Sequence, residues 1–107
     1  MTSSGLICAP AHWAVDFALI SGGDSLKNFH ILDGDVLYCR QQKTCKHDDL
    51  VVLEGANYTS VKKAKNLNGE LIFTDDSGKL SGMKAGERIA GIVIRVLKNF
   101  ESLPALE

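Results

Sequence analysis

The chain has 107 residues, enough for one folded domain and too few for a second core. Apolar residues make up 45% of the chain and charged residues 23%, which is typical of a globular protein and argues against disorder. Lys and Arg total 12 and Asp and Glu total 13, so the formal net charge is -1. This near-neutral charge argues against a domain that binds nucleic-acid phosphates through a net positive charge of its own.

No apolar run reaches the length that a membrane span needs. The longest run, near residues 89–97, is interrupted by Gly91 and Arg95. The N-terminus lacks the basic start of a secretory signal. We therefore expect a soluble, cytoplasmic domain with no membrane contact.

The cysteines are too few, and odd in number, for a disulfide framework: Cys8, Cys39 and Cys45. We expect reduced and mostly buried thiols. The spacing of Cys39 to Cys45, and of Cys45 to His47, differs from that of common zinc sites. The sequence therefore predicts no metal.

We divide the chain into an N-terminal arm (residues 1–16), a domain (17–98) and a C-terminal tail (99–107). The end of the tail, Leu106-Glu107, is open to interpretation as a tag remnant. Apolar runs and turn residues predict the elements of the domain in this order: a strand at 17–20, a helical turn at 25–29, a tight turn at 33–35, strands at 36–40, 50–53 and 58–65, a turn at 66–69, a strand at 71–73, a polar loop at 75–78 and a strand at 89–97.

The last predicted strand, residues 89–97, is apolar on nearly both of its faces. A strand of this kind is expected to be buried on both sides, in the core or against a partner. Short strands separated by turn residues, without a long amphipathic helix, favour a small mainly β domain.

A glycine-rich run ending in Ser25 directly follows the first predicted strand: Gly22-Gly23-Asp24-Ser25. Glycines allow a sharp turn, and main-chain N–H groups that enter a helical turn can stabilise a developing oxyanion. Ser25 is therefore a candidate nucleophile. The alternative is that Ser25 or Asp24 simply caps the helical turn.

A serine nucleophile needs a base. The histidines lie in no recognisable motif, so nothing selects a Ser-His-Asp triad, although one is possible: His12, His30 and His47. A lysine can serve if burial favours its neutral form. Strand alternation separates Lys62 from Lys63 and Lys65 and gives it uncharged neighbours, so it is the best candidate. The alternative is that the three lysines form a solvated edge.

Two segments carry a resemblance to a known family. Residues 25–37 read Ser-Leu-Lys-Asn-Phe-His-Ile-Leu-Asp-Gly-Asp-Val-Leu. This resembles the Ser-Met-x-x-x-x-Ile-x-Asp-Gly-Asp-x-Leu signature of the LexA-like self-cleaving proteins, which include SOS repressors, phage CI-type repressors and the UmuD mutagenesis proteins. Residues 59–63, Thr-Ser-Val-Lys-Lys, resemble the family's Thr-Val-Lys-Arg strand, and Lys62 follows Ser25 by 37 residues, as in the family.

The resemblance covers residues 17–98, including a last strand similar to the family's, and departs from the signature in Leu26, where the family usually has Met. It implies a small, curved, barrel-like, mainly β fold related to that of signal peptidases. It also implies Ser25 as nucleophile, Lys62 as general base and the main-chain N–H groups of Asp24 and Ser25 as the oxyanion hole. Asp33-Gly34-Asp35 becomes a structural turn, and no cofactor is involved.

The resemblance further implies a homodimer that cleaves its own chain, usually at an Ala-Gly or Cys-Gly bond upstream of the serine, when a RecA-like filament triggers it. No such pair precedes Ser25, and no DNA-reading helix-turn-helix precedes the domain. We therefore interpret the chain as a fragment that contacts DNA only through a missing N-terminal domain.

Other classes fit less well. The run Gly23-Asp24-Ser25-Leu26 also spells the signature of an esterase family, but that family needs a histidine near the C-terminus and none follows His47. Ser-Lys signal peptidases need a membrane anchor. The serious alternative is a non-catalytic dimerisation module of a phage-type repressor or a UmuD-like protein, in which the strand at 89–97 pairs with its counterpart.

Overall fold

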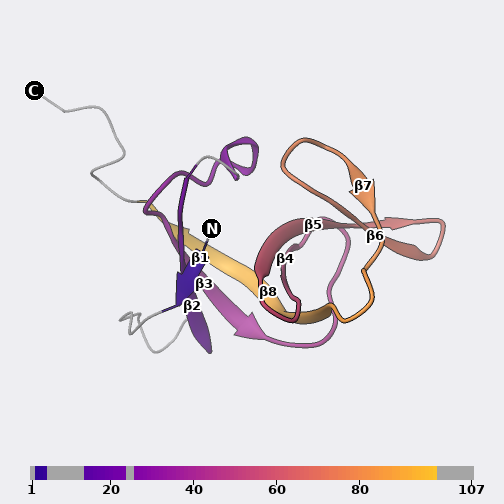
Figure 1. Ribbon diagram of the computed structural model, residues 1–107, viewed down its shortest axis with the longest axis horizontal. Helices are drawn as coiled ribbons and strands as arrows, with labels where there is room; N and C mark the ends of the chain where they lie inside the picture. Colours follow the sequence, from indigo (N-terminus) through magenta and orange to yellow (C-terminus); the bar gives the residue numbers. More distant parts are fainter. Residues whose placement is uncertain (1, 5–13, 24–25, 99–107) are drawn as a thin grey trace, which may run out of the picture.

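The computed structural model describes residues 2–4, 14–23 and 26–98. They form one sheet of eight strands in the order β1-β2-β3-β8-β4-β5-β6-β7 (Figure 1), and all neighbouring strands are antiparallel. The elements are β1 (Thr2–Ser4), β2 (Phe17–Ser21), the short 3-10 helix η2 (Lys27–Phe29), β3 (Val36–Gln41), β4 (Leu50–Glu54), β5 (Thr59–Leu67), β6 (Glu70–Thr74), β7 (Leu80–Ser81) and β8 (Arg88–Leu97). The prediction of a small, mainly β fold is confirmed.

The sheet is strongly curved, and Figure 1 shows β4 and β5 curling round at one end. Register shifts lie between Tyr38 and Cys39 in β3 and between Val52 and Leu53 in β4, where each strand pairs with β8. Such irregularities bend a strand and increase its twist. Within the described residues, the outer strands β1 and β7 do not pair with each other, so the sheet is curved without closing into a barrel.

Two short outer strands were not predicted from the sequence. Thr2–Ser4 pairs with β2, inside what the sequence indicated to be a patternless arm, and Leu80–Ser81 pairs with β6. No helix in the described ranges is long and apolar enough to cross a bilayer.

The sheet lines two apolar clusters, one on each of its faces. The first contains Leu19, Leu26, Ile31, Leu37, Cys39, Val52 and Val61, and the second contains Val51, Leu53, Ala64 and Phe73. Adjacent residues of β4 enter different clusters because successive side chains of a strand point to opposite faces. In β5, Val61 and Ala64 are divided between the clusters in the same way. β5 therefore has one side toward each cluster.

The strand β8 lies inside the sheet, where it pairs with β3 through residues 91–97 and with β4 through residues 88–92. The domain by itself buries only Gly91 of β8, so burial of both faces in the core is not observed, and burial against a partner stays a prediction. Ala90, Val93 and Val96 pack against the first cluster, and Ile89 and Ile92 against the second. Both faces are apolar because β8 contributes to two clusters, each of which covers it only in part.

Gly91 occupies the most crowded point of β8. A Cβ atom there would lie 3.0 Å from the Phe17 ring and would clash with the main-chain oxygen of Arg40. We predict that Gly91→Ala destabilises the fold by about 1–3 kcal/mol, since a backbone oxygen cannot move aside as a flexible side chain can. Gly82→Ala is the matched control, because nothing lies within 4 Å of its added Cβ. Urea unfolding measures both variants, and equal midpoints would contradict the packing argument.

Candidate functional site

The segment that contains the candidate nucleophile is anchored on both sides. Asp24 and Ser25 themselves lie outside the described residues. Before them, the N–H of Gly23, a residue with a left-handed φ of 75°, donates a hydrogen bond of 2.7 Å to Oδ1 of Asp33. After them, Leu26 is 3% exposed and belongs to the first apolar cluster. The main chain is thus held immediately before and immediately after the pair.

The turn at Asp33–Asp35 has a structural function in the observed fold. Asp35 is fully buried, and its Oδ2 accepts a hydrogen bond of 2.8 Å from the Leu32 N–H and forms an ion pair with Lys98 at 2.9 Å. Asp33 instead contacts the glycine loop. The two carboxylates therefore hold different parts of the backbone, in keeping with the interpretation of this run as a structural turn.

A distant carboxylate fixes the 3-10 helix η2. Oδ1 of Asp76, in the turn between β6 and β7, accepts hydrogen bonds from the N–H groups of Asn28 at 2.6 Å and Phe29 at 3.1 Å. The Asn28 side chain donates in return to the main-chain oxygen of Asp76 at 3.1 Å. Asp76 thereby accepts hydrogen bonds from main-chain N–H groups that the side chain of an N-cap residue would otherwise satisfy. The helix ends at His30, whose φ of 64° is left-handed.

Lys62 lies on β5 and is half-buried. Its Nζ donates a hydrogen bond of 3.4 Å to Oγ of Ser81, on β7. The charge of Lys62 is a minor cause of the lowered pKa values of Asp75 and Glu87. Alternation along β5 describes only residues of the same strand, whereas these carboxylates come from the turn after β6 and the loop before β8.

The carboxylates of Asp75 and Glu87 have lowered pKa values. For Asp75 the main cause is a hydrogen bond from the Ser77 hydroxyl, assisted by main-chain N–H groups and, to a smaller extent, by the charge of Lys62. For Glu87 the main cause of the lowered pKa is the Tyr58 hydroxyl, which donates a hydrogen bond of 2.5 Å. The same contact raises the pKa of Tyr58.

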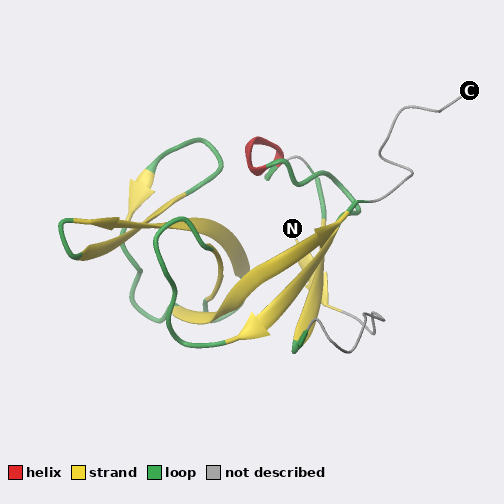
Figure 2. Ribbon diagram, turned by 180° about the vertical axis from the view of Figure 1, so that it is seen from behind, coloured by secondary structure: helices red, strands yellow, loops and turns green. Residues whose placement is uncertain are grey.

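The nucleophile segment and β5 meet at one place in the fold. Nζ of Lys63, next to Lys62, lies 5.7 Å from the centre of the Phe29 ring. Asp75 and Asp76 are adjacent in the chain, and the first is near Lys62 while the second binds η2. Figure 2 shows η2 (red) beside the loop that follows β6. Residues of η2 and of β5 therefore both interact with the turn that follows β6.

The three lysines of β5 do not form a uniform solvated edge, because each is half-buried and has its own partner. Lys62 bonds to Ser81, Lys63 lies over Phe29, and Lys65 forms an ion pair of 2.6 Å with Asp48. The alternative interpretation of the lysine run as a solvated edge is therefore wrong.

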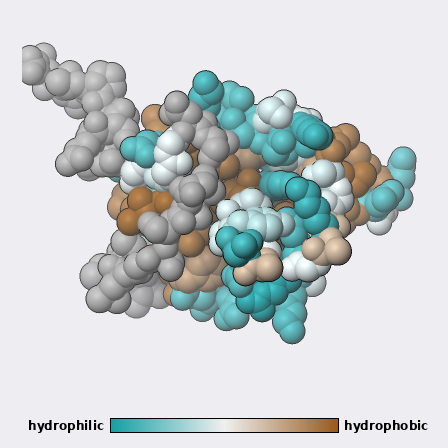
Figure 3. All heavy atoms as spheres, in the orientation of Figure 1, coloured by the Kyte–Doolittle hydropathy of each residue, from teal (hydrophilic) through white to brown (hydrophobic). Residues whose placement is uncertain are grey.

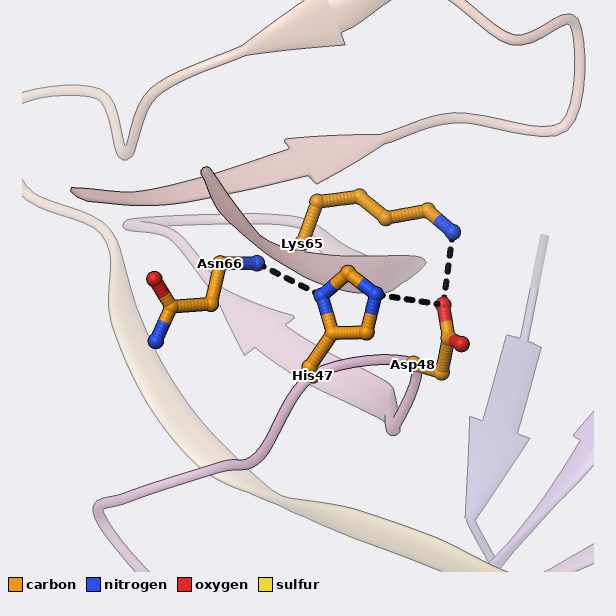
Figure 4. A network of polar contacts seen from close by, with 4 residues as sticks. All are labelled: His47, Asp48, Lys65 and Asn66. Carbon is orange, nitrogen blue, oxygen red and sulfur yellow. Dashed lines mark hydrogen bonds and ion pairs between the residues drawn. The ribbon is translucent and has the colours of Figure 1, made fainter. Parts of the chain in front are cut away.

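A separate group of polar residues links the loop before β4 to β5 (Figure 4). Nδ1 of His47 accepts a hydrogen bond of 2.9 Å from the Asn66 N–H, and its Nε2 lies 3.6 Å from Oδ1 of Asp48, which also binds Lys65. In this cluster His47 and Asp48 contact a main-chain amide and a lysine instead of a serine. The cluster thus has the geometry of a structural clamp, and it does not form a Ser-His-Asp arrangement.

Sequence reasoning missed the two residues that contact the candidate site from outside, Asp76 and Ser81. The sequence indicates only a polar loop at Asp76 and no strand at Ser81. No short motif identifies either residue, because their contacts depend on long-range pairing of β6 with β5 and β7. In the parts of the chain that the structure describes, no group of His, Cys, Asp and Glu side chains could hold a metal ion.

Comparison of the chain with protein-family models and with curated proteins gives no match. The functional argument therefore depends on the residues and their geometry.

The lowered pKa of Asp75 predicts a pH-dependent contribution to stability. Because its pKa is below its ordinary value of 3.8 in the folded state, the unfolded chain binds the proton more readily. The contribution of the Asp75 carboxylate to the free energy of unfolding is complete when the pH is above 3.8. It is lost as the pH falls through the lowered pKa of the folded state. We predict that Asp75→Asn lowers the urea midpoint at pH 7 and that the difference from the unmodified chain shrinks by pH 3.

The exposed carboxylate of Glu70 supplies the control for this titration. Glu70→Gln removes one negative charge without removing a bond within the turn. The urea midpoints of Asp75→Asn and of the unmodified chain are compared at pH 7 and at pH 3. If the two midpoints differ by the same amount at both pH values, the Asp75 carboxylate does not stabilise the turn through its charge.

Proposed function

We propose that this chain is the self-cleaving peptidase and dimerisation domain of a LexA-like or phage CI-like transcriptional repressor, with Ser25 as nucleophile and Lys62 as general base. The two sequence signatures support the proposal, and so does the curved, mainly β fold. The observation that carries it is the contact of η2, directly after the Ser25 segment, with the turn beside Lys62.

The proposed reaction needs both side chains. Ser25 Oγ transfers its proton to the neutral amine of Lys62 and forms a bond to the carbonyl carbon of the target peptide. The oxyanion that results accepts hydrogen bonds from the main-chain N–H groups of Asp24 and Ser25. When the C–N bond breaks, the Lys62 ammonium returns a proton to the leaving amine. Water then hydrolyses the acyl group from Ser25.

The resemblance supplies the rest of the proposal. The target is a peptide bond of the same polypeptide, upstream of Ser25, and a RecA-like filament on single-stranded DNA promotes its cleavage. DNA is bound by a separate N-terminal domain, and the protein acts in the cytoplasm during the response to DNA damage. A UmuD-like mutagenesis protein is the alternative within the same family. No cofactor takes part.

A fluorophosphonate probe tests the dyad in the chain itself. The probe forms a bond between its phosphorus and an activated serine oxygen and releases fluoride, while the serine proton passes to the base. We expect the probe to label the unmodified chain covalently, at a rate that rises with pH. Ser25→Ala abolishes labelling, and Lys62→Ala lowers its rate by about 100-fold or more, as expected for loss of a general base.

Lys65→Ala is the matched control, since it removes another half-buried lysine of β5, one that pairs with Asp48, and keeps Lys62. Tryptic digestion locates the label, because residues 1–27 form one peptide and residues 80–84 form another in which Ser81 is the only hydroxyl residue. Equal labelling of the Lys62→Ala variant, or no labelling of the unmodified chain at any pH, would contradict the proposed function.

The second candidate is a dimerisation module without catalysis, and a specific feature of β8 favours self-association. β4 reaches only to Ile92 along β8, so the strand continues beyond β4 toward Leu97. Apolar side chains also remain at the surface, where Figure 3 shows several apolar residues in brown. The large exposed ones are Leu32, Tyr58, Leu67, Leu71, Leu80, Met83 and Leu97.

We expect a homodimer in sedimentation experiments, with the end of β8 in the interface. Leu97 is 50% exposed, and burial of a leucine side chain contributes about 1.5–3 kcal/mol. Leu97→Glu therefore raises the dimer dissociation constant by about tenfold or more. Leu71→Glu, on the β5–β6 hairpin, is the control that leaves the constant unchanged. A monomer at high protein concentration would count against the dimer.

A further inference from the structure

We propose that Asn68, at the tip of the β5–β6 hairpin, is a modification site that loses its side-chain amide through a cyclic imide and becomes aspartate or isoaspartate. The side chain of Asn66 restrains this reaction, because it binds the main-chain N–H that the reaction needs. The inference concerns a part of the fold that the proposed peptidase function does not use.

The tip of the hairpin is a tight turn that is open to solvent. Asn68 and Gly69 form the whole loop, since Leu67 pairs with Glu70. Their φ angles of 56° and 85° are both left-handed, as a type I′ turn requires. Both residues are exposed, and a Cβ atom added to Gly69 would meet nothing within 4 Å. Water and hydroxide can therefore reach the peptide unit that joins them.

The modification needs no reactant other than water. The main-chain nitrogen of Gly69 gives up its proton and forms a bond to Cγ of Asn68. The C–N bond of the side-chain amide then breaks, and the amide nitrogen takes up a proton and leaves as ammonia. Water opens the resulting cyclic imide at either of its carbonyl groups, which gives aspartate or isoaspartate. The balance of the whole reaction is water taken up and ammonia released.

The sequence singles out Asn68 among the asparagines of the chain. Attack on Cγ requires the next main-chain nitrogen to approach closely, and a side chain on that next residue hinders the approach. Glycine has no side chain and the widest conformational freedom. Only Asn68 is followed by glycine, whereas a Phe, Tyr or Leu follows each of the others, which are Asn28, Asn57, Asn66 and Asn99.

A hydrogen bond from Gly69 to Asn66 opposes the reaction in the folded chain. The Gly69 N–H donates to Oδ1 of Asn66 at 3.0 Å. An N–H group in such a bond gives up its proton less readily, and its nitrogen is held in place. Asn66 itself is fixed, because its own N–H donates to Nδ1 of His47 at 2.9 Å and because it pairs with Leu71. Figure 4 shows the Asn66 side chain directed away from the imidazole, so its oxygen is free for the turn.

The two products affect the hairpin differently. Isoaspartate lengthens the main chain by a methylene group, in a two-residue loop whose length sets the register of β5 and β6. Aspartate keeps the main chain and tolerates a left-handed φ, but it adds a negative charge close to Glu70. Modification of Asn68 therefore changes the charge of the hairpin in both products and its main-chain geometry in one.

Timed incubation of the whole chain at neutral pH, followed by tryptic digestion and mass spectrometry, tests the proposal. Residues 66–79 and 47–62 form separate tryptic peptides, so amide loss at Asn68 and at Asn57 is measured in one sample. We expect faster loss at Asn68 than at Asn57. We expect Asn66→Ala to accelerate the loss at Asn68 by about two- to tenfold, as removal of one hydrogen bond would.

Asn66→Asp is the matched control, because a carboxylate keeps an acceptor for the Gly69 N–H. We expect this variant to lose the Asn68 amide no faster than the unmodified chain. A second control uses urea, in which the hairpin bond is absent. There we expect equal rates for the unmodified chain and Asn66→Ala, and a faster loss than in the folded protein. Circular dichroism checks that each variant is folded without urea.

Each result decides one part of the proposal. No amide loss at Asn68, or faster loss at Asn57, overturns the modification site. Equal rates for folded Asn66→Ala and the folded unmodified chain overturn the restraint by Asn66, and so does a difference between them that persists in urea. If Asn66→Ala does not fold, the unmodified chain alone carries the test, and a rate at Asn68 that is the same with and without urea contradicts the restraint.

Discussion

The candidate site depends on the hydrogen bonds between the Asp76 carboxylate and the main chain of η2. The helix has only three residues, and the loop before it is built on glycines, so this part of the chain has little regular structure of its own. Asp33 holds the glycine loop on the other side, through the N–H of Gly23. Two carboxylates thus bind the main chain at Gly23 and at η2.

The curved sheet determines what that segment can meet. Since β5 has one side toward each apolar cluster, adjacent lysines of one strand have different surroundings, and Lys63 lies over Phe29 while Lys62 contacts Ser81. The β6–β7 turn folds back beside both. The register shifts where β3 and β4 pair with β8 contribute to the curvature of the sheet.

Local patterns were enough to predict most strands, the Asp33–Asp35 turn and the helical turn after Ser25. They could not predict β1 and β7, because strands of three and two residues contain too little alternation to stand out. Nor could they predict that β8 lies between β3 and β4, since strand order follows from pairing between distant segments. The influence of Lys62 on Asp75 and Glu87 was missed for the same reason, because these carboxylates come from other segments of the chain.

The central claim is that a serine hydroxyl and a lysine amine form one reacting pair. A crystal structure of the unmodified chain that resolves the Ser25 side chain, grown at alkaline pH, tests this most directly. The account predicts that Ser25 Oγ lies within hydrogen-bonding distance of Lys62 Nζ, about 2.6–3.2 Å, or slightly more in the absence of substrate. A lysine amine that points away from the Ser25 hydroxyl into solvent in every copy of the chain would contradict the account.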